Sequence, residues 1–125
     1  MSNALKKIQN KIYTLNQLII KVENWKAHKK KIIFSNGCFD LIHLGHIEVL
    51  ARASDLGDVL IVAVNSDKSI KKIKGNKRPI LKEESRLKQI AALEFVDAVL
   101  LFDEDNPYET IKSLLPNVIV KGGDY

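Results

Sequence analysis

His43 and His46 stand three residues apart at the start of a segment, residues 44–56, whose apolar residues recur at helical spacing. Two side chains at this spacing share one face of a helix. Gly45, between them, has no side chain and would let a bulky anion approach the backbone. The first turn of a helix offers free amides and a positive dipole end, and imidazole rings can donate hydrogen bonds to a phosphate. The pattern therefore predicts an anion site that could also stabilise the charge developed during phosphoryl transfer.

Two other interpretations of these residues stay open. A histidine at a helix start can simply cap the helix and pack against it, and for either histidine alone this is the commoner role. Cys38 and Asp40 precede the two histidines, so one short stretch holds four side chains of types that bind zinc. Their spacing does not match a familiar zinc pattern.

The sequence contains neither the Gly-x-x-x-x-Gly-Lys-[Ser/Thr] loop of P-loop enzymes nor the Gly-x-Gly-x-x-Gly run of dinucleotide-binding oxidoreductases. Both classes of protein are therefore disfavoured.

The elements that must position these residues alternate along the chain. We expect helices at residues 16–28, 44–56, 83–93 and 107–115, and strands at residues 31–35, 59–64, 96–102 and 118–120. The near-continuous apolar run of the second strand is typical of a parallel strand covered on both faces. The alternation predicts a single-domain α/β fold, a Rossmann-like doubly wound parallel sheet with right-handed crossovers. In such sheets ligands bind beyond the carboxyl ends of the strands.

A lysine-rich stretch follows the second strand and is the most basic part of the chain. Its cations are Lys68, Lys71, Lys72, Lys74, Lys77 and Arg78. The structural interpretation of such a run is a solvated helix face without a binding role. The functional interpretation is that at least one of these lysines clamps a phosphate, because the stretch begins at the carboxyl end of a strand.

Composition narrows the class of protein further. The 125 residues make one domain, with 46% hydrophobic and 28% charged residues and a net charge of +5. Aromatic residues are few and no basic run is interleaved with them, so we expect no nucleic-acid partner. The single cysteine excludes an intramolecular disulfide and suits a reducing compartment. Without an apolar run of about 20 residues or a signal peptide, we expect a cytoplasmic location and no membrane partner.

Residues 37–40, Gly-Cys-Phe-Asp, followed by residues 43–46, His-Leu-Gly-His, resemble the signature of the cytidylyltransferase-like nucleotidyltransferase superfamily. Residues 57–58, 64–67, 74–79 and 121–125 extend the match, which covers about residues 11–125. Together they are most similar to the adenylyltransferases of bacterial ADP-heptose synthesis, mainly through the Lys-Gly-Gly-Asp-Tyr end. The resemblance implies a nucleotidylyl transferase fold. It also implies transfer of AMP from ATP to a sugar 1-phosphate, D-glycero-β-D-manno-heptose 1-phosphate in those enzymes, with release of pyrophosphate.

The resemblance also implies roles for individual residues. The catalytic residues would be His43, His46 and Lys74. The nucleotide-binding residues would be Gly37, Cys38, Phe39, Gly45, Lys121, Gly122, Gly123 and Asp124. The substrate-phosphate residues would be Lys71, Arg86 and Asp40. For Asp40 the favoured role is to fix its own loop, and for Arg86 a salt bridge at the core's margin is the alternative. Magnesium is expected with ATP, held by phosphates and water.

One departure from the family pattern leaves the activity of this chain open. The family continues past the Gly-Gly-Asp-Tyr turn into another strand and a Ser-Thr-Thr helix start, whereas this sequence stops at Tyr125. The domain, residues 11–125, is therefore expected to lack its C-terminal strand and helix, and residues 1–10 are expected to be disordered or derived from a tag. A CTP-dependent cytidylyltransferase of the glycerol-3-phosphate type and a non-catalytic nucleotide-binding module remain as alternatives, and a homodimer is left open.

Overall fold

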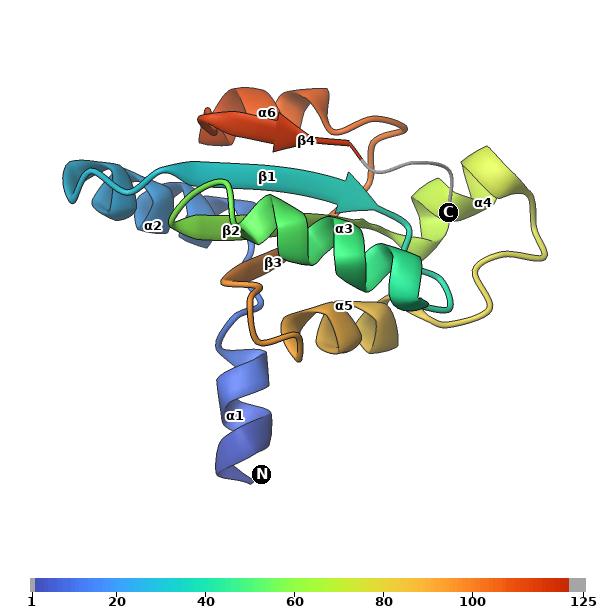
Figure 1. The fold of residues 1–125 in the computed structure, drawn as a ribbon. Coiled ribbons are helices and arrows are strands. Elements are labelled where there is room, and N and C mark those ends of the chain that lie inside the picture. The colour runs from blue at the N-terminus through green and yellow to red at the C-terminus, as the bar shows by residue number, and fades with distance from the viewer. Residues whose placement is uncertain (1, 122–125) are drawn as a thin grey trace.

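Residues 2–121 are described by a computed structural model, and within them four parallel strands form one sheet (Figure 1). The strands are β1 (Ile32–Gly37), β2 (Val59–Asn65), β3 (Ala98–Phe102) and β4 (Val118–Val120), arranged in the order β3-β2-β1-β4. The chain builds outward from β1 through β2 to β3 and then returns to the other side of β1. The point where this order reverses, between β1 and β4, is where doubly wound sheets bind ligands.

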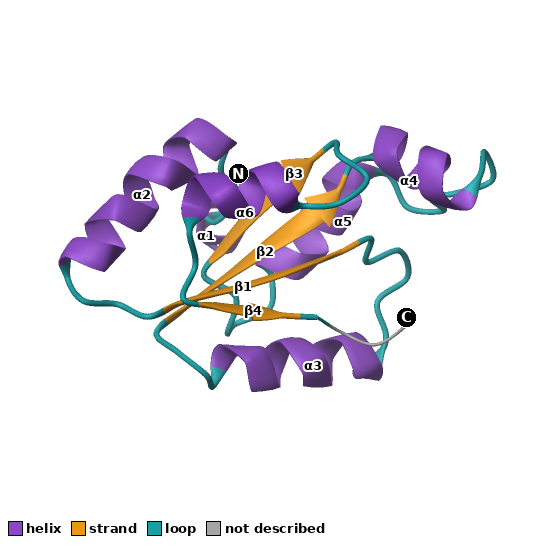
Figure 2. Cartoon of the chain, turned by 90° about the horizontal axis from the view of Figure 1, so that it is seen from above, coloured by secondary structure: helices purple, strands orange, loops and turns teal. Residues whose placement is uncertain are grey.

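Helices cover both faces of the sheet (Figure 2). On one face, α2 (Leu15–Ala27) and α6 (Tyr108–Leu114) pack on a core that includes Phe34, Ile61 and Leu100. On the other face, α3 (Leu44–Ser54) and α5 (Glu83–Ala91) enclose a second core with Ile33 and Val62. Neighbouring residues of one strand thus enter different cores, as the pleat requires. All residues of β2 are buried, which confirms the prediction of a strand covered on both faces.

The fold class predicted from the sequence is confirmed, with small shifts at element ends. The third strand begins at Ala98 rather than at residue 96. Just before it, the backbone N–H of Asp97 donates to the carbonyl of Leu60, and the Asp97 carboxylate accepts the N–H of Leu60 at 2.7 Å. The outer margin of β3 is covered by the chain before α2, where the N–H of Tyr13 donates to Val99 and the N–H of Val99 donates to Lys11.

Two helices of the structure lie outside the helix ranges expected from the sequence. The lysine-rich stretch forms α4 (Asp67–Lys74), which Ser66 caps by accepting a hydrogen bond from the N–H of Ser69. Residues 3–9, expected to be disordered or tag-derived, form α1 (Asn3–Gln9), which contacts α5. Both segments carry too few apolar residues to mark a helix clearly, and the structure agrees with this, since α1 buries no residue and α4 buries only Ser69 and Ile70. In residues 2–121 no helix is both long and apolar enough to cross a membrane.

Candidate active site

The two histidines lie where the chain leaves the central strand and enters α3. Residues 38–43 connect the carboxyl end of β1 to this helix, and both Phe39 and Leu41 hold positive φ angles, 52° and 61°. Such angles are uncommon for residues with a side chain and need support from neighbouring structure. The connection is therefore a shaped loop that carries His43 to a defined place beside the sheet.

His43 and His46 cap α3 reciprocally. Nδ1 of His43 accepts the backbone N–H of Gly45 at 3.0 Å, and Nδ1 of His46 accepts the backbone N–H of His43 at 3.0 Å. The two rings lie with centroids 4.0 Å apart. Because Nδ1 of each neutral ring is an acceptor, its proton sits on Nε2, which turns each Nε2 into a donor. The backbone N–H groups of His43 and Gly45 are thus bonded to the rings, and the Nε2 atoms of the rings carry the N–H donors instead.

This geometry corrects the predicted role of Gly45. A Cβ atom at Gly45 would lie 2.8 Å from Cε1 of His43 and 3.0 Å from Nδ1, so the missing side chain makes room for the imidazole ring. The amide of Gly45 is also taken by His43 and is not free for an anion. An incoming phosphate would therefore meet the exposed ring of His43, and not a bare helix end as the sequence suggested.

Phe39 was predicted to line the nucleotide, but its ring lies in the second core with 1% of its surface exposed. It packs edge-on to His46, with ring centroids 5.8 Å apart. A Cβ atom at Gly37 would lie 3.0 Å from the Phe39 ring, so Gly37 leaves the space that this ring occupies. The side chain of Phe39 therefore supports His46 from within and does not line a surface open to a nucleotide.

The electrostatics around His46 keep its ring neutral. Burial, then the neighbouring His43, then the positive charge of Lys74 lower the pKa of His46 below its ordinary value. His46 is 3% exposed, so its protonated form would be poorly solvated. A neutral ring with Nδ1 occupied is a hydrogen-bond donor and not a cation at neutral pH.

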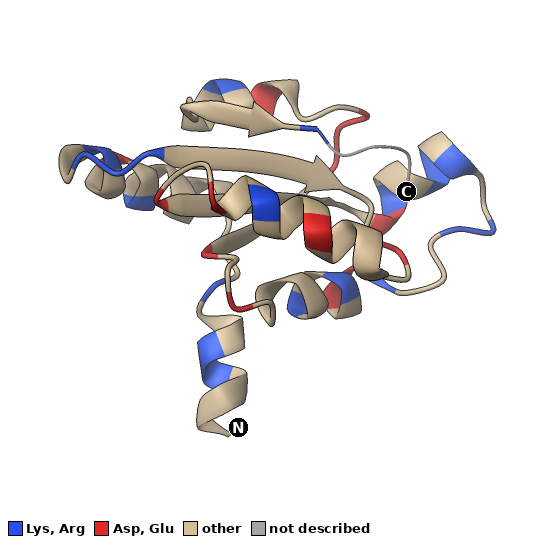
Figure 3. Ribbon diagram, viewed as in Figure 1, with Lys and Arg blue, Asp and Glu red and all other residues tan. Residues whose placement is uncertain are grey.

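Lys74, at the end of α4, belongs to the same site because its charge acts on His46 and on Cys38. Lys71 lies three residues earlier on this helix and is exposed like Lys74, so the two lysines share a face. Figure 3 shows the concentration of basic residues on α4 and the following loop. Lys121 directly follows β4, whose carboxyl end lies beside that of β1 through the pairing of Ser35 with Val120. Cations from two strand ends thus flank the histidine loop.

Cys38 and Asp40 do not join the histidines in a zinc site. The thiol of Cys38 lies 3.7 Å from Oδ1 of Asn65, and burial raises the pKa of the Cys38 thiol, which the charges of Lys74 and Arg86 offset only in part. Within residues 2–121, no group of three or more His, Cys, Asp or Glu side chains is placed to hold a metal ion. A protonated, half-buried thiol is instead part of the wall beneath the loop.

Asp40 fixes the loop, as favoured from the sequence. Its carboxylate accepts the backbone N–H groups of Ile80 and Leu81 at 2.8 and 2.9 Å and pairs with Arg78 at 3.4 Å. Burial alone would raise the pKa of Asp40, but these hydrogen bonds and the Arg78 charge lower it below the ordinary value. The side chain is 5% exposed and occupied by the protein itself, so it does not face a substrate phosphate.

Arg86 was predicted to contact the substrate phosphate, and the structure corrects this. The residue has no exposed surface, and its guanidinium donates to the carbonyls of Cys38, Asn65 and Leu81 and to the carboxylate of Asp67. Sequence reasoning gave no role to Asp67 and Asn65, which it included only in residues 64–67 of the family resemblance. Their position at the carboxyl end of a buried strand was the signal that could have singled them out.

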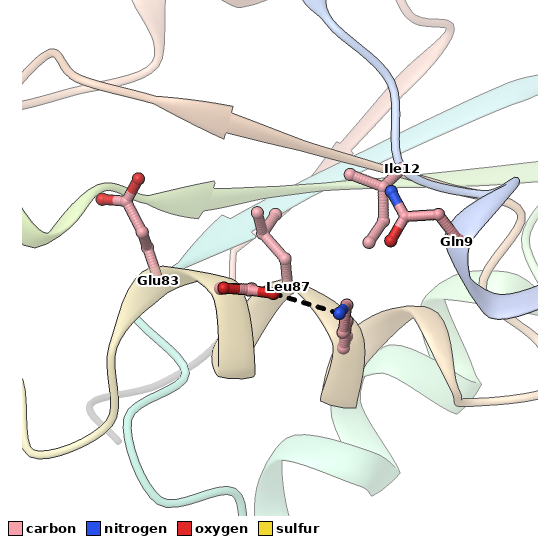
Figure 4. Close-up of a pocket in the computed structure, with 6 residues that line it drawn as sticks. Gln9, Ile12, Glu83 and Leu87 are labelled. Atoms are coloured by element: carbon pink, nitrogen blue, oxygen red, sulfur yellow. Dashed lines mark hydrogen bonds and ion pairs between the residues drawn. The ribbon is translucent and has the colours of Figure 1, made fainter. Parts of the chain in front are cut away.

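Gly122, Gly123 and Asp124, predicted to bind the nucleotide, lie outside the described residues. A hollow of about 210 Å³ lies elsewhere, between the end of α1 and α5 (Figure 4). It is lined by Gln9, Ile12, Glu83, Glu84, Leu87 and Lys88. Neither the histidine loop nor α4 contributes to this lining, so the hollow is separate from the candidate site.

The doubly wound sheet, the paired imidazoles at the first helix start and the lysines of the next helix define an α/β domain that handles nucleotide phosphates. The model of the cytidylyltransferase-like family matches residues 34–125. The chain therefore belongs to the cytidylyltransferase-like family of nucleotidyltransferases.

Relatives of this chain share one name. It is 48% identical over 117 residues to the bifunctional protein HldE of Koribacter versatilis, an alignment that covers 94% of this chain and 24% of that protein. The HldE protein of Helicobacter pylori is 46% identical over 132 residues, covering 100% of this chain and 28% of the relative. The chain thus spans about a quarter of the length of the curated relatives it matches.

A solved structure confirms the fold. The lipopolysaccharide core biosynthesis protein from Thermoplasma volcanium superposes with a TM-score of 0.65 at 37% sequence identity, over 72% of each chain.

Proposed function

We propose that this domain transfers AMP from ATP to a sugar 1-phosphate, a heptose 1-phosphate in particular, and releases pyrophosphate. The observation that carries the proposal is the reciprocal cap of His43 and His46 with Lys74 beside it, at the carboxyl end of the central strand. This arrangement combines the exposed imidazole of His43, supported by His46, with a lysine charge close enough to act on His46. A transferring phosphoryl group requires such a combination.

The reaction needs no general base from the protein. An oxygen of the sugar phosphate, already an anion, attacks the α-phosphorus of ATP, and the bond from that phosphorus to the oxygen bridging to the β-phosphate breaks. The electron pair leaves with pyrophosphate. The protein has to align two anions and stabilise the charge on the α-phosphate oxygens. His43, exposed at the mouth of the loop, would donate to those oxygens, and Lys74 and Lys71 would offset the repulsion between the two phosphates.

The substrate assignment is supported by the relatives. The name HldE is shared by proteins 43–56% identical to this chain, and the matching solved structure carries lipopolysaccharide core biosynthesis in its title. The motif resemblance to the adenylyltransferases of ADP-heptose synthesis points the same way. The family's name, cytidylyltransferase-like, makes CTP the competing nucleotide.

Magnesium enters the proposal with ATP. Its preferred ligands are phosphate oxygens and water, and the described residues form no carboxylate or imidazole cage of their own. Bound to the triphosphate, the ion would neutralise charge on the pyrophosphate leaving group. Lys71, Lys74 and Lys121 would supply the protein's own share of this neutralisation from three separate positions.

A pyrophosphate-release assay tests the proposal. ATP and CTP are each offered with heptose 1-phosphate and with glycerol 3-phosphate, in the presence of Mg²⁺. Release only with ATP and heptose 1-phosphate is the expected result. Release only with CTP would replace the adenylyl assignment by a cytidylyltransferase. ATP binding by calorimetry without release from any pair would leave a nucleotide-binding module.

A further inference from the structure

Arg86 is a charged side chain with no exposed surface, and it hydrogen-bonds to the start of the histidine loop, to the end of β2 with the start of α4, and to the residues before α5. Its Nη1 atom donates to the carbonyl of Cys38 at 2.8 Å and to that of Asn65 at 2.6 Å. Its Nε atom donates to the carbonyl of Leu81 at 2.9 Å, and its Nη2 atom forms an ion pair with Asp67 at 2.7 Å. The partners come from three separate stretches of the chain.

We infer that Arg86 is a positioning residue that sets the placement of the histidine pair relative to the lysines of α4. The inference rests on the proposed function, since it assigns both groups to the same phosphates. It gives the buried guanidinium a task in catalysis without any contact with substrate.

The first connection runs to the histidine loop. Cys38 is the first residue after β1, and the loop that follows contains the positive φ angles of Phe39 and Leu41. A loop with two such residues is held only if its surroundings over-determine it. Arg86 holds the loop at the carbonyl of Cys38, and Asp40 holds it further along through the N–H groups of Ile80 and Leu81.

The second connection runs to the lysine helix. Asp67 is the first residue of α4, and Lys71 and Lys74 lie four and seven residues later, on the same face of the helix as Asp67. The N–H of Asp67 also donates to Glu83 at 2.9 Å, so two residues of α5, Glu83 and Arg86, bind this end of α4. A displacement of Asp67 would therefore carry the two lysines with it.

The chemistry of the side chain suits this task. A guanidinium is planar and rigid, so the carbonyl of Cys38 and the carboxylate of Asp67 are held in a fixed relation by one group. A lysine has a single flexible ammonium and could not reproduce these directions. Because the charge is fully buried, the loss of a partner is not compensated by water.

The test uses the pKa of His46 to report the position of Lys74, because the Lys74 charge lowers that pKa. NMR titration of the His46 ring in folded Lys74→Ala should show a raised pKa, since a nearby positive charge is gone. Asp67→Asn keeps the shape of the carboxylate but breaks the ion pair. If α4 then moves, the pKa of His46 should rise by most of the same amount. The opposite sign is expected from the direct effect of removing a negative charge.

The double variant Asp67→Asn with Lys74→Ala separates positioning from general damage. No further rise beyond Lys74→Ala is expected, because the charge that moves is absent. In the transfer assay, Asp67→Asn should lose about 10²-fold in kcat, the size that a misplacement of about 1 Å produces, and much less in the Lys74→Ala background. Arg86→Lys should behave like Asp67→Asn wherever circular dichroism shows it folded, and if it does not fold the Asp67 variants decide.

Glu84→Gln is the matched control, since Glu84 lies in the first turn of α5 and pairs with Lys88, away from Arg86. It should leave both the His46 pKa and the rate unchanged. The inference is overturned if Asp67→Asn leaves the pKa of His46 unchanged or lowered, or if its effects add fully to those of Lys74→Ala. A wild-type chain without transfer activity would defeat the proposed function alone, because the titration still decides the positioning role.

Discussion

The outer nitrogen of His43 can be separated from its capping role by one substitution. Asparagine is among the most favourable N-cap residues, but its side chain has no donor at the position of the His43 Nε2 atom. His43→Asn should therefore keep the free energy of unfolding within about 1 kcal/mol of wild type. Its transfer rate should fall about 10²–10³-fold, the loss typical of one removed donor to a developing oxyanion.

Urea unfolding and the pyrophosphate assay measure the two effects of His43→Asn. His43→Ala is the comparison, because it removes the cap and the donor together and should also lower stability. A fully active, stable Asn variant would show that the Nε2 donor of His43 has no part in the reaction.

His46 makes stability depend on pH. Burial, His43 and Lys74 lower its pKa, so the unfolded chain takes up a proton that the native ring resists. The stabilising contribution is complete above the ordinary histidine pKa of about 6.5 and is lost as the pH falls from there toward the lower native pKa. His46→Gln can still accept the N–H of His43 at the third helical position, but it does not titrate.

Urea unfolding of both proteins between about pH 8 and pH 5.5 should therefore show a steeper loss for wild type than for His46→Gln. The two curves should agree best at the alkaline end. Parallel curves over the whole range would contradict the buried, neutral state of His46.

At the scale of single residues, the sequence indicated which positions lie together more often than which contacts they make. The pairing of the two histidines could be predicted from their spacing, whereas Lys74 was singled out from the lysine-rich stretch only by the family resemblance; the structure places its charge near His46. For Arg86 the salt-bridge alternative is what the structure shows, with Asp67, but its carbonyl partners could not be predicted, since Cys38 and Asn65 lie 48 and 21 residues away along the chain. Only the packed fold shows that its donors are already occupied.

At the scale of elements, predictability followed burial. Every residue of β2 is buried, and its continuous apolar run therefore predicted the strand correctly. Helix α4 buries only Ser69 and Ile70, and its lysine-rich sequence could be interpreted as a solvated helix face or as a phosphate-binding segment without deciding its bounds. The roles of Gly37 and Gly45 could be predicted only in part. A glycine indicates that space is needed, but the sequence does not show which neighbouring side chain fills that space.

Two glycines at the two ends of α3 test that point. Alanine is normally favoured over glycine inside a helix by about 1 kcal/mol. In Gly45→Ala the new Cβ would lie 2.8 Å from Cε1 of His43, so the ring must turn away from the position seen here. We expect a large loss of transfer rate with little change in thermal stability, because the cap lost with the displaced ring, worth about 1 kcal/mol, is offset by the preference for alanine in the helix.

Gly57→Ala should show the reverse. There the new Cβ would lie 2.7 Å from Cδ1 of Ile33, which is fully buried, and 2.9 Å from the carbonyl of Lys31. Overpacking of this kind costs about 1–3 kcal/mol. The melting temperature should fall, while the folded protein keeps its kcat because the site lies at the far end of the helix. If Gly45→Ala melts early and remains active, the proposed function of the space at Gly45 is wrong.

At the scale of the whole molecule, the positive charge is unevenly placed. The chain carries a net charge of +5, and six cations fall between Lys68 and Arg78, on α4 and the loop after it. This group stands on the side of the sheet where the strands end, together with Lys121 after β4. A field of this kind raises the local concentration of polyanions and acts over about 10 Å at 0.1 M salt.

The position of a lysine, and not the net charge, should therefore decide how strongly ATP stabilises the protein. ATP that binds only the native state raises the melting temperature, and added salt should reduce this rise. Lys71→Ala and Lys7→Ala remove the same charge from exposed helix positions, but Lys7 lies on α1, outside the group on α4. We expect the ATP-induced rise and its salt dependence to shrink in Lys71→Ala and to stay as in wild type in Lys7→Ala. Equal losses in both variants would mean that ATP responds to the overall charge, and that α4 is only a solvated surface.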